Sequence, residues 1–110
     1  CADTPVDTDI LPTIAEGTAI AQPIRLREVL GVLRETGGGA VTLTEDEIVQ
    51  ATFALARMGL YVEPTAAQAV GAFAKLLAAG TITPEQTTVL VLTGSGLKAT
   101  ARIAEQLPGP

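Results

Sequence analysis

The segment between Leu92 and Lys98 has residue types that could hold a ligand. It reads Leu-Thr-Gly-Ser-Gly-Leu-Lys and lies between an apolar run and an expected helix. Small residues let a ligand approach the backbone, and the hydroxyls of Thr93 and Ser95 can donate or accept hydrogen bonds. Neither the dinucleotide-binding nor the phosphate-loop glycine pattern is satisfied. Taken alone, an ordinary glycine-rich turn is therefore the simpler interpretation.

Glu63 is a second residue that could take part in chemistry. Pro64 follows it and favours an extended backbone at Glu63, between an apolar stretch and an apolar helix. A carboxylate in such surroundings needs a partner or a shifted pKa. It could equally help to cap the following helix, because negative charge is favourable at a helix N-terminus. The residues alone leave both interpretations open.

Several kinds of site are excluded by what the composition lacks. The 110 residues contain no histidine, and Cys1 is the only cysteine. An intrachain disulfide, a cysteine zinc cluster and a histidine-activated nucleophile therefore cannot form within them. We expect no metal site.

The charge balance argues against nucleic acid as a partner, and the hydropathy argues against a membrane. Seven basic and twelve acidic residues give a net charge of −5, which would repel a phosphate backbone. No apolar run reaches the roughly 20 residues that span a bilayer. We therefore expect a cytoplasmic protein with neither partner.

Two amphipathic helices are expected in the first half of the chain. The first covers 23–35, beginning at a proline and stopped by three glycines, and 40–43 should form a short strand. Thr44 and Glu47 form a capping box that starts the second helix, which Gly59 ends. The apolar face of this second helix comprises Ile48, Ala51, Leu55 and Met58.

The second half is expected to contain a buried helix and a buried strand. Thr65 can cap a helix over 66–79, which is apolar on nearly every side and should therefore be buried, and Gly80 closes it. The continuous apolar run at 88–92 is typical of a strand covered on both faces. A last helix is expected over 97–106.

The chain is expected to form one domain of the α/β class. Its length allows one hydrophobic core but not two. Residues 1–12 are polar and without periodicity, and are predicted to be an extended lead-in. Residues 13–110 should form a partial α/β domain, with few strands flanked by helices.

Several segments in order resemble one family of enzymes, the threonine synthases. The resemblance covers nearly everything from Thr13 to Lys98. It is carried by Thr13-Ile14-Ala15-Glu16-Gly17, Pro23-x-Arg25, the region from Val41 to Glu47, Glu63-Pro64-Thr65-Ala66-Ala67, and Leu92-Thr93-Gly94-Ser95-Gly96-Leu97-Lys98. The chain is similar to the C-terminal portion of these enzymes, which are pyridoxal-phosphate enzymes of the tryptophan-synthase-β-like class.

The resemblance implies a role for three residues in binding pyridoxal 5'-phosphate. Gly17 matches the position whose backbone packs against a face of the cofactor ring, and Glu63 matches a glutamate that approaches the cofactor. Thr93 matches the residue whose hydroxyl bonds the pyridine nitrogen. A neutral hydroxyl leaves that nitrogen largely unprotonated, which gives a weaker electron sink than a carboxylate partner would.

The resemblance also implies a reaction and a missing part. The parent enzyme would convert O-phosphohomoserine and water to threonine and phosphate. The catalytic lysine of the family has no match here, since neither Lys75 nor Lys98 lies in the lysine motif, and Arg25 fits a solvated helix charge. We therefore expect the 110 residues to be inactive alone. Their partners would be the rest of the parent enzyme and a small amino-acid substrate, and self-association or domain swapping is expected.

Two alternatives remain open. The first is another pyridoxal-phosphate lyase, such as a threonine or serine deaminase, a class that shares the T-I-A-D-G and E-P motifs but usually carries a different glycine-rich turn. The second is a stand-alone, non-catalytic binding domain, in which Cys1 would be the acylated start of a lipoprotein. We favour a piece of a longer protein over this reading of Cys1.

Overall fold

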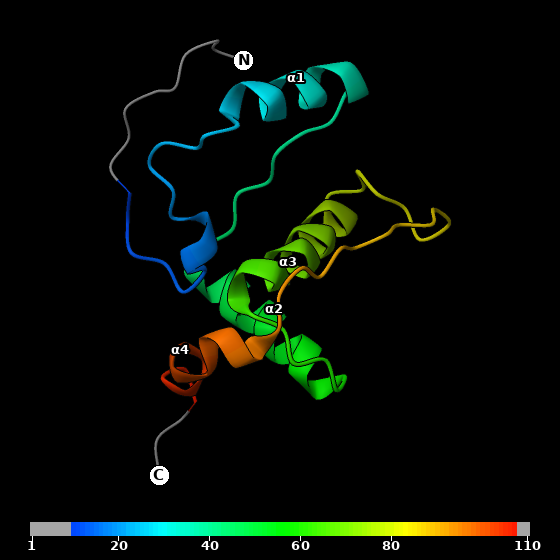
Figure 1. Cartoon of the computed structure of the whole chain (residues 1–110). Coiled ribbons are helices and arrows are strands. Elements are labelled where there is room, and N and C mark those ends of the chain that lie inside the picture. The colour runs from blue at the N-terminus through cyan, green and yellow to red at the C-terminus, as the bar shows by residue number, and fades with distance from the viewer. Residues whose placement is uncertain (1–9, 108–110) are drawn as a thin grey trace.

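The computed structural model describes residues 10–107, and in that range the chain is built from helices (Figure 1). Helices α2 and α3 cross in the middle of the molecule, with α1 and α4 at opposite ends. The α-helices are α1 (Leu26–Thr36), α2 (Glu45–Arg57), α3 (Pro64–Ala78) and α4 (Thr100–Ala104), and the 3-10 helices are η1 (Glu16–Thr18) and η2 (Gly96–Ala99).

Helix α2 begins and ends as its sequence predicts. The hydroxyl of Thr44 accepts from the Glu47 backbone N–H at 3.2 Å, and the Glu47 carboxylate accepts from the Thr44 N–H at 2.7 Å. This capping box satisfies two donors that the first turn would otherwise leave unpaired. At the other end Gly59 has a φ of 82°, a conformation that glycine adopts without strain.

The apolar face of α2 is confirmed except at its last position. Ile48, Ala51 and Leu55 are buried, whereas the Met58 side chain is 73% exposed. Met58 is already the residue that caps the C-terminus of α2, so its side chain lies beyond the stretch that α3 covers. The prediction that Met58 faces the core was wrong.

Helix α3 differs from its prediction in its start and in its burial. Its N-cap is Glu63, with Pro64 as the first helical residue, whereas Thr65 had been expected to cap it. Only the first turn is buried, and residues 74, 75 and 77–79 are exposed. The expectation of a helix buried on all sides was wrong, because the described part of the chain covers α3 mainly where α2 crosses it.

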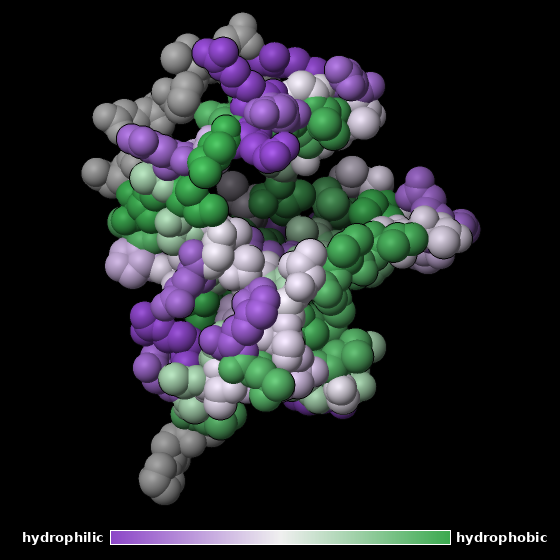
Figure 2. All heavy atoms as spheres, viewed as in Figure 1, coloured by the Kyte–Doolittle hydropathy of each residue, from purple (hydrophilic) through white to green (hydrophobic). Residues whose placement is uncertain are grey.

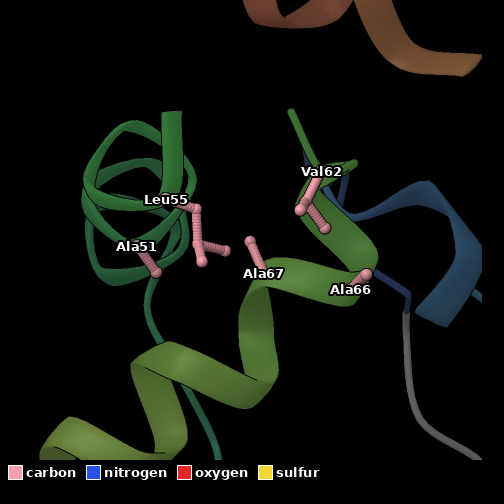
Figure 3. Packing of buried hydrophobic residues seen from close by; sticks show 5 residues of the cluster. All are labelled: Ala51, Leu55, Val62, Ala66 and Ala67. Atoms are coloured by element: carbon pink, nitrogen blue, oxygen red, sulfur yellow. The ribbon is translucent and has the colours of Figure 1, made fainter. Parts of the chain in front are cut away.

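The hydrophobic core lies at the crossing of α2 and α3 (Figure 3). The Leu55 side chain projects from α2 toward Ala67, and the alanines let the two helices approach closely. Burying a leucine side chain stabilises a fold by about 1.5–3 kcal/mol, so Leu55 is the largest single contributor here. The buried cluster comprises Ala51, Leu55, Val62, Ala66 and Ala67, with Val70 and Leu92 packed against it.

The predicted strands at 40–43 and 88–92 are not observed. Residues 10–107 contain one isolated antiparallel bridge, between Val62 and Ser95, and no strand. Val89 is 80% exposed, although the apolar run was expected to be covered on both faces, and apolar spheres follow this segment in Figure 2. A strand requires a hydrogen-bonded neighbour, and the described residues offer none along either segment. The helical architecture therefore leaves the strands of the α/β prediction unconfirmed.

The remaining helix boundaries are partly as expected. Helix α1 starts at Leu26 rather than at 23 and ends, as predicted, at Gly37, whose φ is 65°. The C-terminal helix predicted over 97–106 is divided into η2 and α4, with the Ser95 hydroxyl accepting from the Leu97 N–H at 3.3 Å. In the range 10–107 no helix combines the length and apolar character that crossing a bilayer demands. Most of the 1–12 lead-in lies outside the described residues.

Candidate functional site

The glycine-rich turn and Glu63 lie side by side in the structure. The Glu63 N–H donates to the Gly94 carbonyl at 3.1 Å, and the Gly96 N–H donates to the Tyr61 carbonyl at 2.9 Å. These two hydrogen bonds flank the bridge between Val62 and Ser95. The turn that follows Thr93 is therefore fixed against the residues that lead into α3.

Two glycines of this turn are explained by close neighbours. A Cβ at Gly94 would overlap the Glu63 carboxylate, and a Cβ at Gly96 would lie 2.8 Å from carbons of the Tyr61 ring. Any side chain at either position would displace its neighbour. Sequence reasoning missed Tyr61, whose hydroxyl donates to Thr100 Oγ1 at 3.0 Å and so connects the turn to α4.

The backbone carbonyl and the side-chain carboxylate of Glu63 have different surroundings. Its carbonyl accepts from the N–H groups of Ala66 and Ala67, both at 3.0 Å, which are the first backbone hydrogen bonds of α3. Its carboxylate is half-buried against Gly94 and makes no hydrogen bond or ion pair within residues 10–107. Glu63 thus occupies the N-cap position of α3, but its side chain makes no capping hydrogen bond.

Thr93 lies on the surface beside this carboxylate-bearing segment. Its side chain is exposed, and its hydroxyl has no partner in the described part of the chain. A hydroxyl of this kind can donate one hydrogen bond and accept two. Thr93 and Glu63 therefore each present an unused polar group near the start of α3.

Gly17 comes from the N-terminal part of the chain and contacts the start of α3. Its backbone N–H donates to Thr65 Oγ1 at 3.1 Å, although 48 residues separate the two. Gly17 itself is exposed, whereas Ala15 in the same loop is completely buried. Each of the three residues predicted from the sequence is thus connected to Glu63-Pro64-Thr65: Glu63 by position, Thr93 through its neighbour Gly94, and Gly17 through Thr65.

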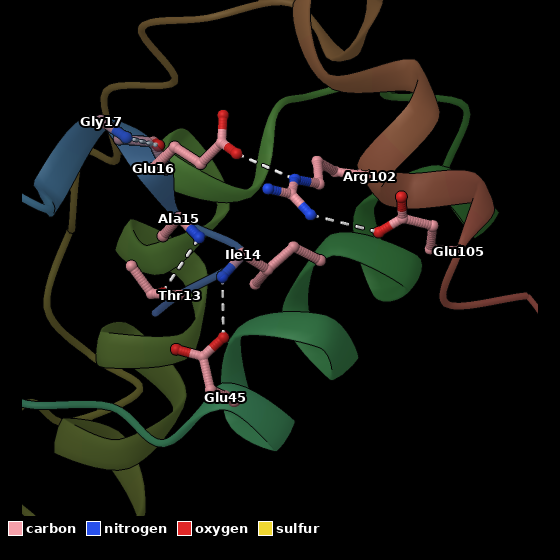
Figure 4. Close-up of polar contacts among 9 residues, drawn as sticks. Thr13, Ile14, Ala15, Glu16, Gly17, Glu45, Arg102 and Glu105 are labelled. Carbon is pink, nitrogen blue, oxygen red and sulfur yellow. Dashed lines mark hydrogen bonds and ion pairs between the residues drawn. The ribbon is translucent and has the colours of Figure 1, made fainter. Parts of the chain in front are cut away.

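The loop that carries Gly17 is held by further polar contacts (Figure 4). The Ile14 N–H donates to Glu45 Oε2 at 2.8 Å at the start of α2. Arg102 Nε of α4 pairs with Glu16 Oε1 at 2.8 Å, and Arg102 Nη1 lies 3.4 Å from Glu105 Oε2. The Glu16 carboxylate, with Glu105, raises the pKa of Arg102, so the guanidinium stays charged.

A pocket of about 340 Å³ lies next to these contacts. It was not foreseen from the sequence, because its lining comes from three separate segments. None of the three predicted site residues lines it. The residues around it are Pro12, Thr13, Ile14, Glu45, Asp46, Val49, Arg102, Glu105 and Gln106.

The cationic side chains that were not expected to take part in the site are exposed. Lys75 Nζ donates to the Thr42 carbonyl at 3.0 Å and pairs with the Glu47 carboxylate at 3.1 Å. Lys98 is exposed in η2, and Arg25 is exposed immediately before α1. Within residues 10–107 no group of three or more acidic, cysteine or histidine side chains is arranged to hold a metal ion.

Comparison with known proteins gives a consistent result. Residues 1–94 match the family model described as pyridoxal-phosphate dependent enzyme. The chain is 38% identical over 96 residues to a threonine synthase of Methanocaldococcus jannaschii, an alignment that covers 82% of this chain and 24% of the relative.

Two further relatives have similar names and coverage. A threonine synthase of Methanosarcina acetivorans is 38% identical over 87 residues, covering 78% of this chain and 22% of the relative. Threonine synthase 2, chloroplastic, of Arabidopsis thaliana is 31% identical over 88 residues, covering 80% and 17%. The chain spans about a quarter of the length of the first of these relatives, and less of the others.

Proposed function

The chain belongs to the family of pyridoxal-phosphate dependent enzymes, and on this premise we propose that it is part of a threonine synthase. The parent enzyme would convert O-phosphohomoserine and water to threonine and phosphate. The proposal is supported by the three relatives named as threonine synthases, each aligned over about four-fifths of this chain. The substrate of the parent enzyme, the rest of its chain and its oligomeric assembly are likewise proposed.

The groups at the start of α3 fit the family's cofactor, pyridoxal phosphate. The Thr93 hydroxyl is exposed, neither it nor the Glu63 carboxylate has a partner within residues 10–107, and Gly17 presents backbone without a side chain. A hydroxyl suits an aromatic nitrogen, and bare backbone suits a flat ring. When bound, the cofactor supplies an electron-withdrawing ring that stabilises negative charge on the substrate carbon.

Each residue would make a distinct contribution. Thr93 Oγ1 would donate a hydrogen bond to the pyridine nitrogen, and its neutrality would leave that nitrogen unprotonated. The Glu63 carboxylate, which packs on Gly94, would accept a hydrogen bond from the bound cofactor. Gly17 would let the ring approach its backbone. The observation that carries the assignment is the connection of these three positions to Glu63-Pro64-Thr65.

The lysine that carries the cofactor is proposed to come from the parent enzyme beyond these 110 residues. Lys75 Nζ is already bound to the Thr42 carbonyl and to Glu47, and Lys98 is an exposed residue of η2. We therefore propose that the 110 residues are inactive alone. A cytoplasmic location is likewise part of the proposal, and one relative carries the name chloroplastic.

The test uses the full-length protein that contains this chain. Thr93→Val removes the hydroxyl at nearly constant volume, and Thr88→Val is the matched control, since Thr88 is an exposed threonine in the same extended region. We expect Thr93→Val to slow phosphate release from O-phosphohomoserine roughly tenfold, the effect of losing one hydrogen bond. It should also change the absorption spectrum of the bound cofactor, while Thr88→Val changes neither.

Three results would contradict the proposal in different ways. Ammonia release from threonine or serine without phosphate release from O-phosphohomoserine would establish the deaminase alternative. Failure to bind pyridoxal phosphate at all would favour the non-catalytic binding domain. Equal spectra and rates for the Thr93 and Thr88 variants would remove Thr93 from the cofactor site while leaving the overall activity in place.

A further inference from the structure

We propose that Thr65 is a positioning residue, which holds the backbone of Gly17 at the start of α3. This inference rests on the proposed function, in which the Gly17 backbone meets the cofactor ring. Thr65 was expected to cap α3, but the residue at the N-cap position is Glu63. The threonine side chain is therefore free to serve another element, and the structure places it on η1.

Both branches of the Thr65 side chain contact Gly17. The hydroxyl accepts the Gly17 N–H at 3.1 Å. A Cβ at Gly17 would lie 2.8 Å from Thr65 Cγ2 and 2.9 Å from Oγ1, which is closer than real Cβ contacts. The two residues are thus matched: Thr65 fills the space that a side chain at position 17 would need, and its hydroxyl fixes the peptide there.

Threonine suits this position better than its closest analogues. Serine keeps the hydroxyl but lacks the methyl, and valine keeps the branched shape but lacks the acceptor. A β-branched side chain also has few χ1 conformations, so its two branches hold their directions. Thr65 is half-buried, whereas its hydrogen bond to the Gly17 N–H lies in an exposed part of the surface.

Secondary contacts limit how the loop can move around this hydrogen bond. Gln68 Nε2 of α3 donates to Thr18 Oγ1 at 3.3 Å, and Arg102 pairs with Glu16 on the other side of Gly17. The Arg102 and Glu16 side chains are 54% and 63% exposed, and such ion pairs contribute little. Thr65 is therefore the side chain that bonds to the Gly17 backbone itself.

The position of Thr65 also couples Gly17 to the rest of the site. Thr65 follows Glu63 by two residues, and the Glu63 N–H is bonded to Gly94, the neighbour of Thr93. The stretch Glu63-Pro64-Thr65 thus contacts Gly17 through the Thr65 side chain and the glycine-rich turn through the Glu63 backbone. A change at Thr65 should shift Gly17 relative to Glu63 without removing any group that touches substrate.

The first experiment measures the hydrogen bond directly by amide hydrogen exchange in the full-length protein. Thr65→Val should accelerate exchange of the Gly17 N–H by roughly tenfold or more, because its acceptor is lost, whereas Thr65→Ser should retain most of the protection. The N–H groups of Glu63 and Gly96 report on global folding, since their acceptors do not change. Unchanged Gly17 exchange in Thr65→Val would overturn the inference.

The second experiment is a double-mutant cycle on cofactor affinity in the same protein. Gly17→Ala should weaken binding of pyridoxal phosphate roughly tenfold in the Thr65 background, because the new methyl collides with the threonine. Thr65→Ala removes both colliding atoms, so in that background the loss from Gly17→Ala should fall to about threefold or less. Additive effects would contradict the proposed matching of the two residues.

The two proposals can fail separately. Exchange of the Gly17 N–H reports the contact with Thr65 whether or not the cofactor is present. If Thr65→Val frees this amide but the Gly17 variants leave cofactor affinity unchanged, the contact exists and the proposed cofactor role of Gly17 falls. If Thr93→Val changes the cofactor spectrum but Thr65→Val leaves the exchange rate of the Gly17 N–H unchanged, the proposed function stands and the positioning inference is wrong.

Discussion

At the start of α3 three glycines each lie against one particular side chain. Gly17 meets Thr65, Gly94 meets the Glu63 carboxylate, and Gly96 meets the Tyr61 ring. An ordinary turn would need glycine for its backbone angles, but none of these three has a positive φ. Their requirement is for space, which makes them part of the same packed arrangement as the polar groups of the proposed site.

Ionisation of Glu47 should affect the stability of the described fold. Its carboxylate accepts from the Thr44 backbone N–H and from Lys75, and these hydrogen bonds lower its pKa below the usual 4.5. A lowered pKa in the folded state means that the stabilisation is present above about pH 4.5. It is lost as the pH falls through the folded pKa.

Replacement of Glu47 should therefore flatten the acid dependence of stability. Glu47→Gln is expected to reduce the loss of helix signal in circular dichroism as the pH falls below about 4.5, because glutamine does not titrate. Asp46→Asn is the control, since it lies in the same turn and its carboxylate has no hydrogen-bond partner within residues 10–107. A larger effect from Asp46→Asn would contradict the assignment.

Among the elements, α1 depends most on local signals. None of its residues is buried, so packing contributes less to it than to α2 and α3. Its C-terminus is closed by Gly37 in the left-handed conformation, with the N–H groups of Gly37 and Gly38 both donating to the Leu33 carbonyl. An isolated helix of this length is marginal in water, so single substitutions should be visible.

Two glycines of α1 should respond in opposite directions to alanine. Gly31 lies inside the helix with nothing within 4 Å of an added Cβ, so Gly31→Ala should stabilise α1 by about 1 kcal/mol. Gly37 has a positive φ, so Gly37→Ala should destabilise its C-terminus by about 1–2 kcal/mol. Cα chemical shifts across α1 measure both effects, and a change of the same sign in both variants would contradict this explanation.

Many large apolar side chains of the described residues are exposed to solvent. The radius of gyration is 15.3 Å, against about 13 Å for a compact domain of this length. Val89 and Val91, in an extended segment without strand partners, are 80% and 69% exposed. The relatives are several times longer than this chain, and a segment of this kind is suited to pairing with another strand.

The isolated 110 residues should therefore self-associate through the segment 88–92. Replacing Val89 and Val91 together by lysine should shift the chain toward monomer, because charge on an exposed strand discourages pairing. Val32→Lys is the control, as Val32 is an exposed valine outside this segment, on α1. Sedimentation over a range of concentrations measures the shift. A monomer at every concentration, or an equal effect from Val32→Lys, would contradict the prediction.

The sequence determined those features whose causes lie within a few residues. The Thr44–Glu47 capping box was readable because donor and acceptor are three positions apart, and the glycines at 37, 59 and 80 were readable because their positive φ ends a helix locally. The family was likewise readable from the order of its motifs. These motifs pointed to Gly17, Glu63 and Thr93, whose roles stay predictions.

Only the tertiary structure decided what depends on distant neighbours. Whether 88–92 forms a strand depends on a partner strand, and whether α3 is buried depends on what crosses it, so the apolar pattern overestimated both. The hydrogen bond between Gly17 and Thr65 and the pairing of Glu16 with Arg102 join residues 48 and 86 positions apart. Such contacts follow from how the helices cross, which no local pattern contains.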